Sequence, residues 1–242
     1  MAAPSIVSLV DRREIARATT AFSFQKPAGF SFIAGQFLRL KLPQLPDDAL
    51  RSNIRSLSIA SAPFEDTLVV AMRSGTSTFK QTLWALPIGT DVEIAGPYGR
   101  FVLHDDPTLP AIFLAGGIGI TPMRSIILQA LHEQKPHQLF LFSSNSTPPD
   151  SAFFDELERQ ASVHTNFHFI PTMTNVTTLD EPWTGEIELM SQAMIERYLK
   201  TDIQKARYSI AGPPTMVSAM RAMLTAAAVP SNQFMSEEFS GY

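Results

Sequence analysis

The chain has no cysteine among its 242 residues. This absence excludes disulfide bonds, thiolate zinc sites, cysteine nucleophiles and cysteine-ligated iron–sulfur clusters within this sequence. Charge is also sparse, since charged residues make up 17% and the formal net charge is −4 at pH 7. A slightly acidic balance argues against a nucleic-acid partner, because such proteins usually carry a basic surface.

Long apolar runs are missing as well. The longest, Ala111 to Ile120, is about half of what a membrane-spanning helix needs. The N-terminus reads MAAPSIVSLVDRRE and lacks the basic region and apolar core of a secretory signal. We therefore expect no membrane span and a cytoplasmic location.

The first part of the chain is typical of short strands separated by turns. Apolar runs rich in branched and aromatic residues predict strands over 6–10, 21–24, 36–41, 56–59, 67–72 and 91–94. One helix over 78–86 interrupts them, with Phe79, Leu83 and Leu86 at helical spacing. This pattern predicts an antiparallel barrel or sandwich.

Strands and helices alternate in the second part. Strands are predicted over 111–115, 138–143, 167–171, 208–211 and 233–235, and helices over 122–133, 153–160, 191–199 and 213–228. Such alternation predicts a doubly wound parallel sheet with right-handed crossovers. A polar, proline-containing segment joins the two parts, so we assign residues 1–106 to the first domain and 107–242 to the second.

A glycine cluster is the most informative segment of the second domain. Residues 115–122 read Ala-Gly-Gly-Ile-Gly-Ile-Thr-Pro and lie between a strand and a helix, where free N–H groups can bind a phosphate. Pro122 occupies the place of the third glycine of the usual dinucleotide fingerprint. A tight strand–helix turn without a ligand is the alternative.

A second strand–turn–helix junction follows later. Residues 211–216 read Ala-Gly-Pro-Pro-Thr-Met. Ligands of doubly wound sheets bind at the carboxyl ends of the strands, so both turns are expected to face one crevice. The alternative is that Gly212 and its prolines only begin a helix.

Two polar segments of the first domain suit a phosphate-bearing ligand. Arg55-Ser56-Leu57-Ser58 places a cation and hydroxyls on an apolar strand. Gly75-Thr76-Ser77-Thr78 precedes the predicted helix and offers hydroxyls at its N-terminus. The alternatives are outward-facing polar residues and an ordinary helix N-cap.

Together these segments resemble the ferredoxin–NADP reductase-like flavoprotein family. Residues 55–58 are similar to its Arg-x-Tyr-Ser motif, with Leu57 in place of the tyrosine. Residues 96–101 are similar to its Gly-Pro-aromatic-Gly-x-Phe segment. The two glycine turns, 116–122 and 211–216, are similar to its nucleotide-binding segments. The resemblance spans almost the whole chain and implies a flavin-binding β-barrel followed by a nucleotide-binding α/β domain.

The resemblance also implies the cofactors FAD and NAD(P)H and the residues that contact them. At the flavin it implies Arg55, Ser56, Leu57, Ser58, Met72, Arg73, Ser77, Thr78, Phe239 and Tyr242. At the dinucleotide it implies Gly117, Gly119, Thr121, Gly212, Pro213 and Met216. The residues implied to position the reacting groups are Ser58, Thr121, Glu238 and Tyr242.

Particular roles follow from the same resemblance. Arg55 would pair with the flavin pyrophosphate, and Ser58 would bond near the flavin N5 edge. Thr121 would lie closest to the nicotinamide. Leu57 would pack on the flavin without the hydrogen bond of the tyrosine. A C-terminal aromatic ring, preferably Tyr242, would cover the flavin.

The implied reaction is hydride transfer from NAD(P)H to FAD, followed by electron transfer to a separate acceptor. That acceptor could be a ferredoxin, a flavodoxin, an oxygenase component or a small molecule. A flavin-free Rossmann-type dehydrogenase and a non-catalytic module of the same fold stay open as alternatives. We expect a monomer or weak oligomer. We also expect no metal site, because the five histidines lack metal-ligand spacing. Segment 143–146 has neither an arginine nor an acid to choose between NADH and NADPH.

Overall fold

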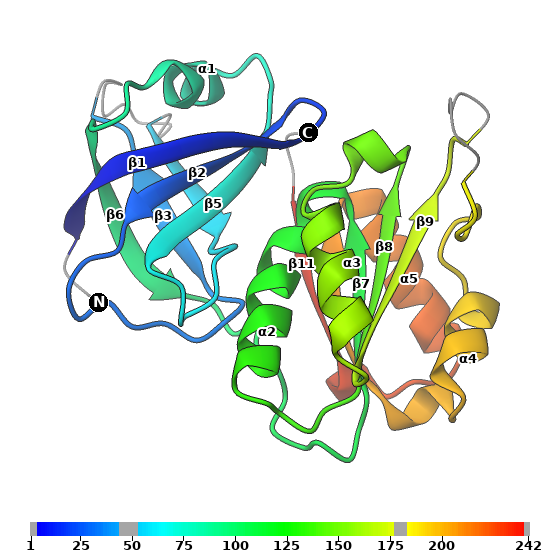
Figure 1. Ribbon diagram of the computed structural model, residues 1–242. Coiled ribbons are helices and arrows are strands. Elements are labelled where there is room, and N and C mark those ends of the chain that lie inside the picture. Colours follow the sequence, from blue (N-terminus) through cyan, green and yellow to red (C-terminus); the bar gives the residue numbers. More distant parts are fainter. Residues whose placement is uncertain (1–3, 44–52, 177–182, 240–242) are drawn as a thin grey trace.

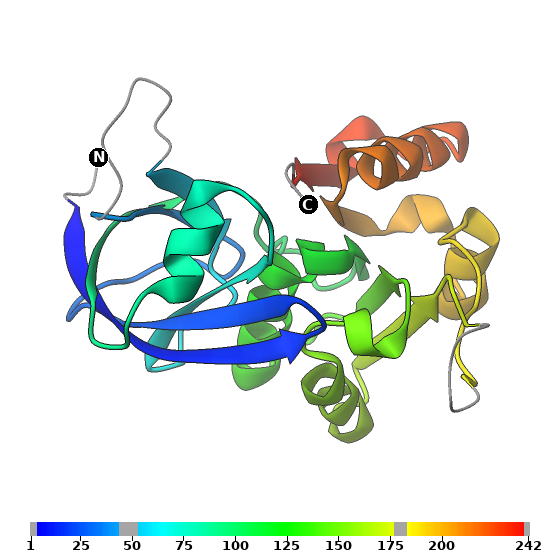
Figure 2. The same ribbon diagram turned by 90° about the horizontal axis from the view of Figure 1, so that it is seen from above.

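Two β-sheets, each in its own lobe, form the protein (Figure 1). The computed structural model describes residues 4–43, 53–176 and 183–239. Seen from above, the antiparallel lobe lies beside the parallel lobe, with α2 close to the junction (Figure 2). Within the described residues, no helix is long and apolar enough to cross a membrane.

The first sheet is antiparallel and has the strand order β4-β3-β6-β1-β2-β5. Its elements are β1 (Ser5–Ala16), β2 (Thr19–Gln25), β3 (Phe37–Lys41), β4 (Ile54–Ser58), β5 (Thr67–Arg73), α1 (Thr78–Ala85) and β6 (Asp91–Tyr98). Leu38 and Leu40 are fully buried whereas Arg39 between them is exposed, as the period of a half-buried strand requires. Contacts between β4 and β5 bring the two sheet edges together. The antiparallel barrel class is confirmed.

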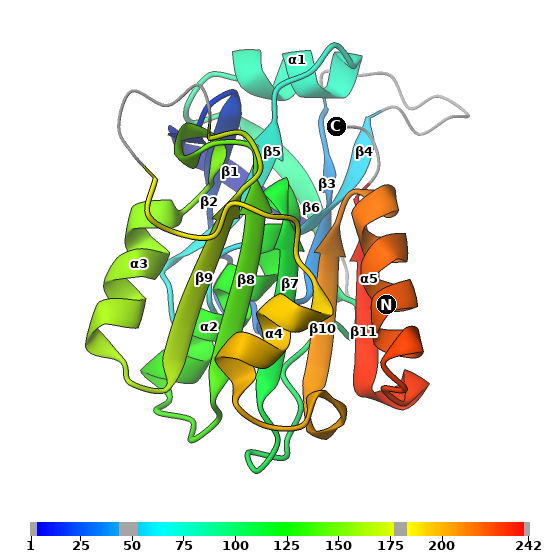
Figure 3. The same ribbon diagram turned by 90° about the vertical axis from the view of Figure 1, so that its right-hand side faces the viewer.

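The second sheet is parallel, in the order β11-β10-β7-β8-β9. Its elements are β7 (Ala111–Gly116), α2 (Ile120–His132), β8 (Leu139–Asn145), α3 (Phe154–Val163), β9 (Phe167–Met173), α4 (Gln192–Leu199), β10 (Arg207–Gly212), α5 (Pro214–Ala226) and β11 (Phe234–Glu238). Figure 3 shows this sheet face-on, with α4 in front of it and α2 behind.

Alternate residues of β7 build the two cores of this sheet. Phe113 and Ala115 pack with residues of α2 and α3, whereas Ile112 and Leu114 pack with residues of α4 and α5. Every residue of β7 is buried, as expected for a central parallel strand covered on both faces. The doubly wound class is therefore confirmed.

Apolar contacts join the two lobes. Ala60 and Phe101 of the first lobe belong to the same buried cluster as Ile126 of α2. Gly35 lies so close that an added β-carbon would be 1.9 Å from the Phe101 carbonyl oxygen and 2.8 Å from Cδ1 of Ile126. The lobes therefore share a packed interface, and the boundary between residues 106 and 107 stays a prediction.

Candidate functional site

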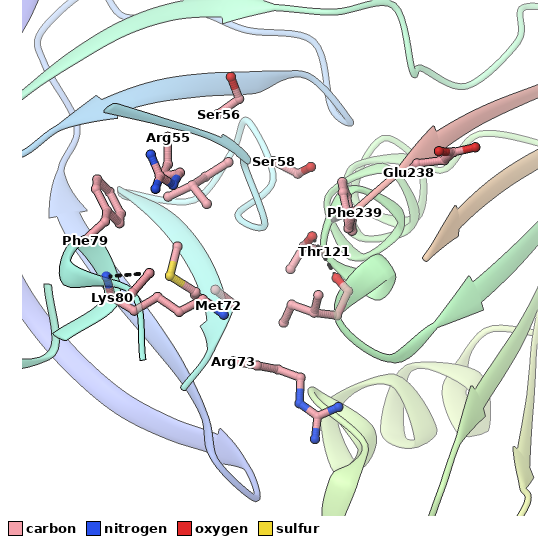
Figure 4. Close-up of a pocket in the computed structure, with 14 residues that line it drawn as sticks. Arg55, Ser56, Ser58, Met72, Arg73, Phe79, Lys80, Thr121, Glu238 and Phe239 are labelled. Atoms are coloured by element: carbon pink, nitrogen blue, oxygen red, sulfur yellow. Dashed lines mark hydrogen bonds between the residues drawn. The ribbon is translucent and has the colours of Figure 1, made fainter. Parts of the chain in front are cut away.

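A cavity of about 530 Å³ opens between the two lobes, beside the edge strands β4 and β5 (Figure 4). The start of α1 also borders it, and the start of α2 and the end of β11 complete it. Its lining residues are Arg55, Ser56, Leu57, Ser58, Ala71, Met72, Arg73, Ser77, Phe79, Lys80, Ile118, Thr121, Glu238 and Phe239.

Residues that the sequence analysis assigned to one site come together here from distant segments. The predicted residues that line the cavity are Arg55, Ser56, Leu57, Ser58, Met72, Arg73, Ser77, Thr121, Glu238 and Phe239. The predicted residues that do not line it are Thr78, Gly117, Gly119, Gly212, Pro213 and Met216. Tyr242 lies outside the described residues. All of these cofactor assignments stay predictions.

Cationic side chains surround one part of the cavity. Arg55 and Lys80 lie near the Phe79 ring, with the Arg55 guanidinium carbon 5.2 Å from its centroid, and Arg73 extends from the end of β5 (Figure 4). Burial lowers the pKa of Lys80, and the charges of Arg73 and Arg55 lower it further. Lys80 also occupies the first turn of α1, where the helix dipole disfavours a cation. An anionic ligand in this part of the cavity would interact favourably with these cations.

Apolar side chains from both lobes also line the cavity. Leu57 and Met72 come from β4 and β5, whereas Ile118 and Phe239 come from the second lobe. The amide of Phe239 donates a hydrogen bond of 3.0 Å to the Gly212 carbonyl, which ties the end of β11 to the second glycine turn. A flat aromatic ligand would thus find apolar side chains on two sides.

Two buried hydroxyl groups face this space. Ser58 ends β4 and points across the cavity toward Phe239 and Thr121 (Figure 4). Thr121 lies in the first turn of α2, and its Oγ1 donates to the Ile118 carbonyl at 3.0 Å. That hydrogen bond fixes the hydroxyl, and the hydroxyl oxygen can still accept a hydrogen bond from a ligand.

The two glycine turns pack directly against each other. A β-carbon on Gly119 would lie 2.1 Å from the Ala211 carbonyl oxygen, and one on Gly212 would lie 3.1 Å from Gly116 backbone atoms. Close packing therefore accounts for Gly119 without any ligand. Gly117 differs, since it has φ of +53° and no atom within 4 Å of an added β-carbon. Its backbone is open to a ligand.

Sequence reasoning missed Ala71, Phe79, Lys80 and Ile118 as lining residues. Phe79 had a signal, but its helical spacing indicated only a core position. It also missed Glu237, the neighbour of the predicted Glu238. Burial raises the pKa of Glu237 to about 7, and its Oε1 would be 4.0 Å from a β-carbon on Gly99. The alternation of side chains along β11 is the signal that separates these two glutamates.

No group of three or more His, Asp or Glu side chains able to hold a metal ion occurs in 4–43, 53–176 and 183–239. His104 and His137 do form an edge-to-face pair, with ring centroids 4.9 Å apart. Both ring nitrogens of His104 are buried without a hydrogen-bond partner. This pair lies at the junction of the two domains predicted from the sequence, away from the cavity residues.

Comparisons with known proteins agree with this architecture. Residues 113–222 match the family model of the oxidoreductase NAD-binding domain. The chain is 26% identical over 220 residues to the propane 2-monooxygenase reductase component of Rhodococcus jostii, covering 89% of this chain and 57% of that protein. It is 28% identical over 225 residues to NADH-cytochrome b5 reductase 1 of Emericella nidulans, covering 88% of this chain and 71% of that protein.

A solved ferredoxin NADP+ reductase from Neisseria gonorrhoeae, with bound FAD and NADP, has the same fold. It superimposes with a TM-score of 0.81 at 21% identity, covering 98% of this chain and 99% of that chain. The chain thus has the two-domain fold of that reductase, with a cavity between its lobes. Its sequence and fold are thus similar to those of the ferredoxin–NADP reductase-like proteins.

Proposed function

We propose that this protein is a flavin-dependent NAD(P)H oxidoreductase that passes a hydride from NAD(P)H to FAD and then electrons to a separate acceptor. The observation that carries the proposal is that Arg55 of β4 and Lys80 of the first turn of α1 line one cavity, together with apolar side chains from both lobes. Cations and helix N–H groups suit a pyrophosphate, and an apolar slot suits an aromatic ring system.

The residues of the first lobe would hold the flavin. Arg55, Lys80 and the N–H groups that follow Ser77 would bind its pyrophosphate, which favours FAD over FMN. Leu57 and Met72 would contact the ring system. A bound flavin supplies the hydride acceptor, so the protein needs only to bind, orient and exclude water.

The second lobe would present the nicotinamide dinucleotide. The dinucleotide would approach the backbone of Gly117, and Thr121 would orient the nicotinamide from the start of α2. Pro213 and Met216 would form the far wall of the crevice. Phe239 would cover the flavin until the nicotinamide displaces it, a role that the sequence analysis preferred to give to Tyr242.

The acceptor is proposed to be a partner protein. Relatives named as reductase components of monooxygenases support this proposal. The chain spans 57% of the length of the propane 2-monooxygenase reductase component, so the assignment rests on the cavity as well as on that likeness. The cytoplasmic location and the monomeric or weakly oligomeric state stay predictions.

Colour tests the proposed function directly. Purified protein is titrated with FAD, and anaerobic NADH or NADPH is then added. We expect stoichiometric flavin uptake and bleaching of the flavin absorbance. A protein that takes up no FAD contradicts the proposal and leaves the flavin-free dehydrogenase and the non-catalytic module as alternatives. Uptake of FAD without bleaching by either nucleotide contradicts the proposed hydride transfer.

A further inference from the structure

Arg124 on α2 connects the two lobes through a buried cluster of ions. Its side chain is 7% exposed, and it meets Glu65 of the first lobe and Glu156 of α3. The guanidinium also donates to the Ala60 carbonyl at 2.7 Å. One cation therefore binds segments of both lobes and of two helices at once.

Every N–H group of this guanidinium has an acceptor. Nε and Nη2 donate to the two oxygens of Glu156 at 2.6 and 2.7 Å. Nη1 and Nη2 donate to the two oxygens of Glu65 at 2.9 and 3.1 Å, and Nη1 also donates to Ala60. A guanidinium has five N–H donors, so the fork is fully used. A lysine could not reproduce this geometry.

The cluster joins segments that are close in sequence to residues of both walls of the cavity. On α2, Arg124 follows Thr121 by about one helical turn. On the other side, Ala60 comes two residues after Ser58. Ser125 adds a parallel contact, because its Oγ donates to the Ser61 carbonyl at 2.7 Å. Segment 60–65 is thus attached to α2 along one side.

The backbone of Phe153, next to Arg124, is strained, which indicates that the surroundings of Arg124 are tightly fixed. Phe153 places its ring 4.9 Å from the Arg124 guanidinium carbon, and it has a left-handed φ of +61°. That conformation is unusual for a bulky residue and persists only where the surroundings enforce it. Buried ion clusters rarely stabilise a fold more than apolar packing does, but they can specify one arrangement of the segments that they join.

We propose that Arg124 is a positioning residue for hydride transfer. By attaching segment 60–65 to α2 through Glu65, it sets the separation between the flavin wall at Ser58 and the nicotinamide wall at Thr121. The inference rests on the proposed function for its kinetic consequence. Its geometric content, a fixed separation of the two lobes, does not depend on any cofactor.

The two glutamates allow a matched test. Glu65 bridges the lobes, whereas Glu156 lies in the same lobe as Arg124. We expect Glu65→Gln to slow flavin reduction at saturating nucleotide between tenfold and a hundredfold, because misplacement by about 1 Å can cost a hundredfold. Flavin content and nucleotide Kd stay within twofold. Glu156→Gln lowers the melting temperature comparably but changes the reduction rate less than twofold.

A second measurement needs no flavin. Because the chain has no cysteine, Ile88→Cys and Val163→Cys place one spin label on each lobe without competing thiols. We expect one narrow label-to-label distance in the parent and in Glu156→Gln, and a broad distribution in Glu65→Gln. If Glu65→Gln does not fold, Arg124→Lys replaces it in both measurements, with the same expectations.

Two results would overturn the inference. One is a wild-type reduction rate together with a narrow distance in Glu65→Gln. The other is an equal loss of rate in both glutamine variants, which would mean that the cluster only stabilises the fold. If the parent protein itself is not reduced, the proposed function fails, and the distance measurement alone decides whether Arg124 fixes the lobes.

Discussion

Gly119 lies against the carbonyl oxygen of Ala211, so closely that a β-carbon at position 119 would stand 2.1 Å from that oxygen. The Ala211 carbonyl belongs to the backbone of β10, and the Cα atom of Gly119 belongs to the backbone at the start of α2. Neither can move without shifting one of these two elements. We expect Gly119→Ala to lower the free energy of unfolding by about 3 kcal/mol, the upper part of the range for overpacking. Urea unfolding measures it.

Gly29→Ala is the control for this substitution. Gly29 has φ of +76° but no atom within 4 Å of an added β-carbon. The control therefore costs only the backbone strain, about 1 kcal/mol. Equal losses in the two variants would show that the contact between the turns does not constrain Gly119.

Arg55 is expected to recognise phosphate rather than the flavin ring. Arg55→Gln should weaken FAD binding by about 1.5–3 kcal/mol, roughly 10- to 150-fold, because a charge-assisted hydrogen bond is lost. Riboflavin has no phosphate, so its affinity should change little. Fluorescence titration with both ligands measures the difference. An equal loss for FAD and riboflavin would place Arg55 at the ring instead.

Arg39→Gln is the matched control for Arg55→Gln. Arg39 lies on the neighbouring strand β3, is exposed, and does not line the cavity. We expect it to leave both affinities unchanged. A loss of FAD affinity as large as that of Arg55→Gln would indicate a general effect of positive charge on the first lobe.

The order of strands and helices could be predicted from apolar periodicity alone. Element ends could not. The strand predicted over 6–10 continues as β1 to Ala16, because Arg12, Arg13 and Glu14 pair with β2 while their side chains stay exposed. A polar run on an exposed hairpin lacks apolar periodicity, so the strand predicted from the sequence ends at residue 10.

The residues of the candidate site also differ in how far the sequence predicts them. Ser58 and Thr121 belong to motifs that resemble those of a known family, and both line the cavity, whereas their roles stay predictions. Lys80 could not be predicted, because its surroundings include Arg55, which lies on a distant strand. The pairing of Arg124 with Glu65 is equally invisible, since it exists only after the lobes have packed.

His104 should make the protein sensitive to acid. Burial, together with the neighbouring His137 and Arg207, lowers its pKa to about 4. In the unfolded chain its pKa returns to about 6.5, so between these values the unfolded state binds more protons. Its contribution to stability is complete above about pH 6.5 and is lost as pH falls toward 4.

The variant His104→Phe keeps the ring and removes the titration. We expect its unfolding free energy to fall less than that of the parent between pH 6.5 and 4, as measured by urea unfolding. His132→Phe, at an exposed position, serves as control and should follow the parent. A parent-like pH profile for His104→Phe would show that His104 does not contribute to acid sensitivity.

Glu237 should have the opposite effect on the pH dependence of stability, over an overlapping range of pH. Burial raises its pKa to about 7 in the folded state, against about 4.5 when unfolded, so the folded state binds more protons in between. Its contribution to stability is complete below about pH 4.5 and is lost as pH rises through 7. The parent profile is therefore flattened, because His104 and Glu237 offset each other.

Substitution of Glu237 separates the two effects. Glu237→Gln removes the loss at rising pH, so its unfolding free energy should climb from pH 4.5 to 7 more steeply than that of the parent. Glu238→Gln is the control, because its side chain is exposed and no such change is expected. The unfolding free energies of the two glutamine variants could instead depend on pH in the same way. That result would show that burial does not raise the pKa of Glu237 in the folded state.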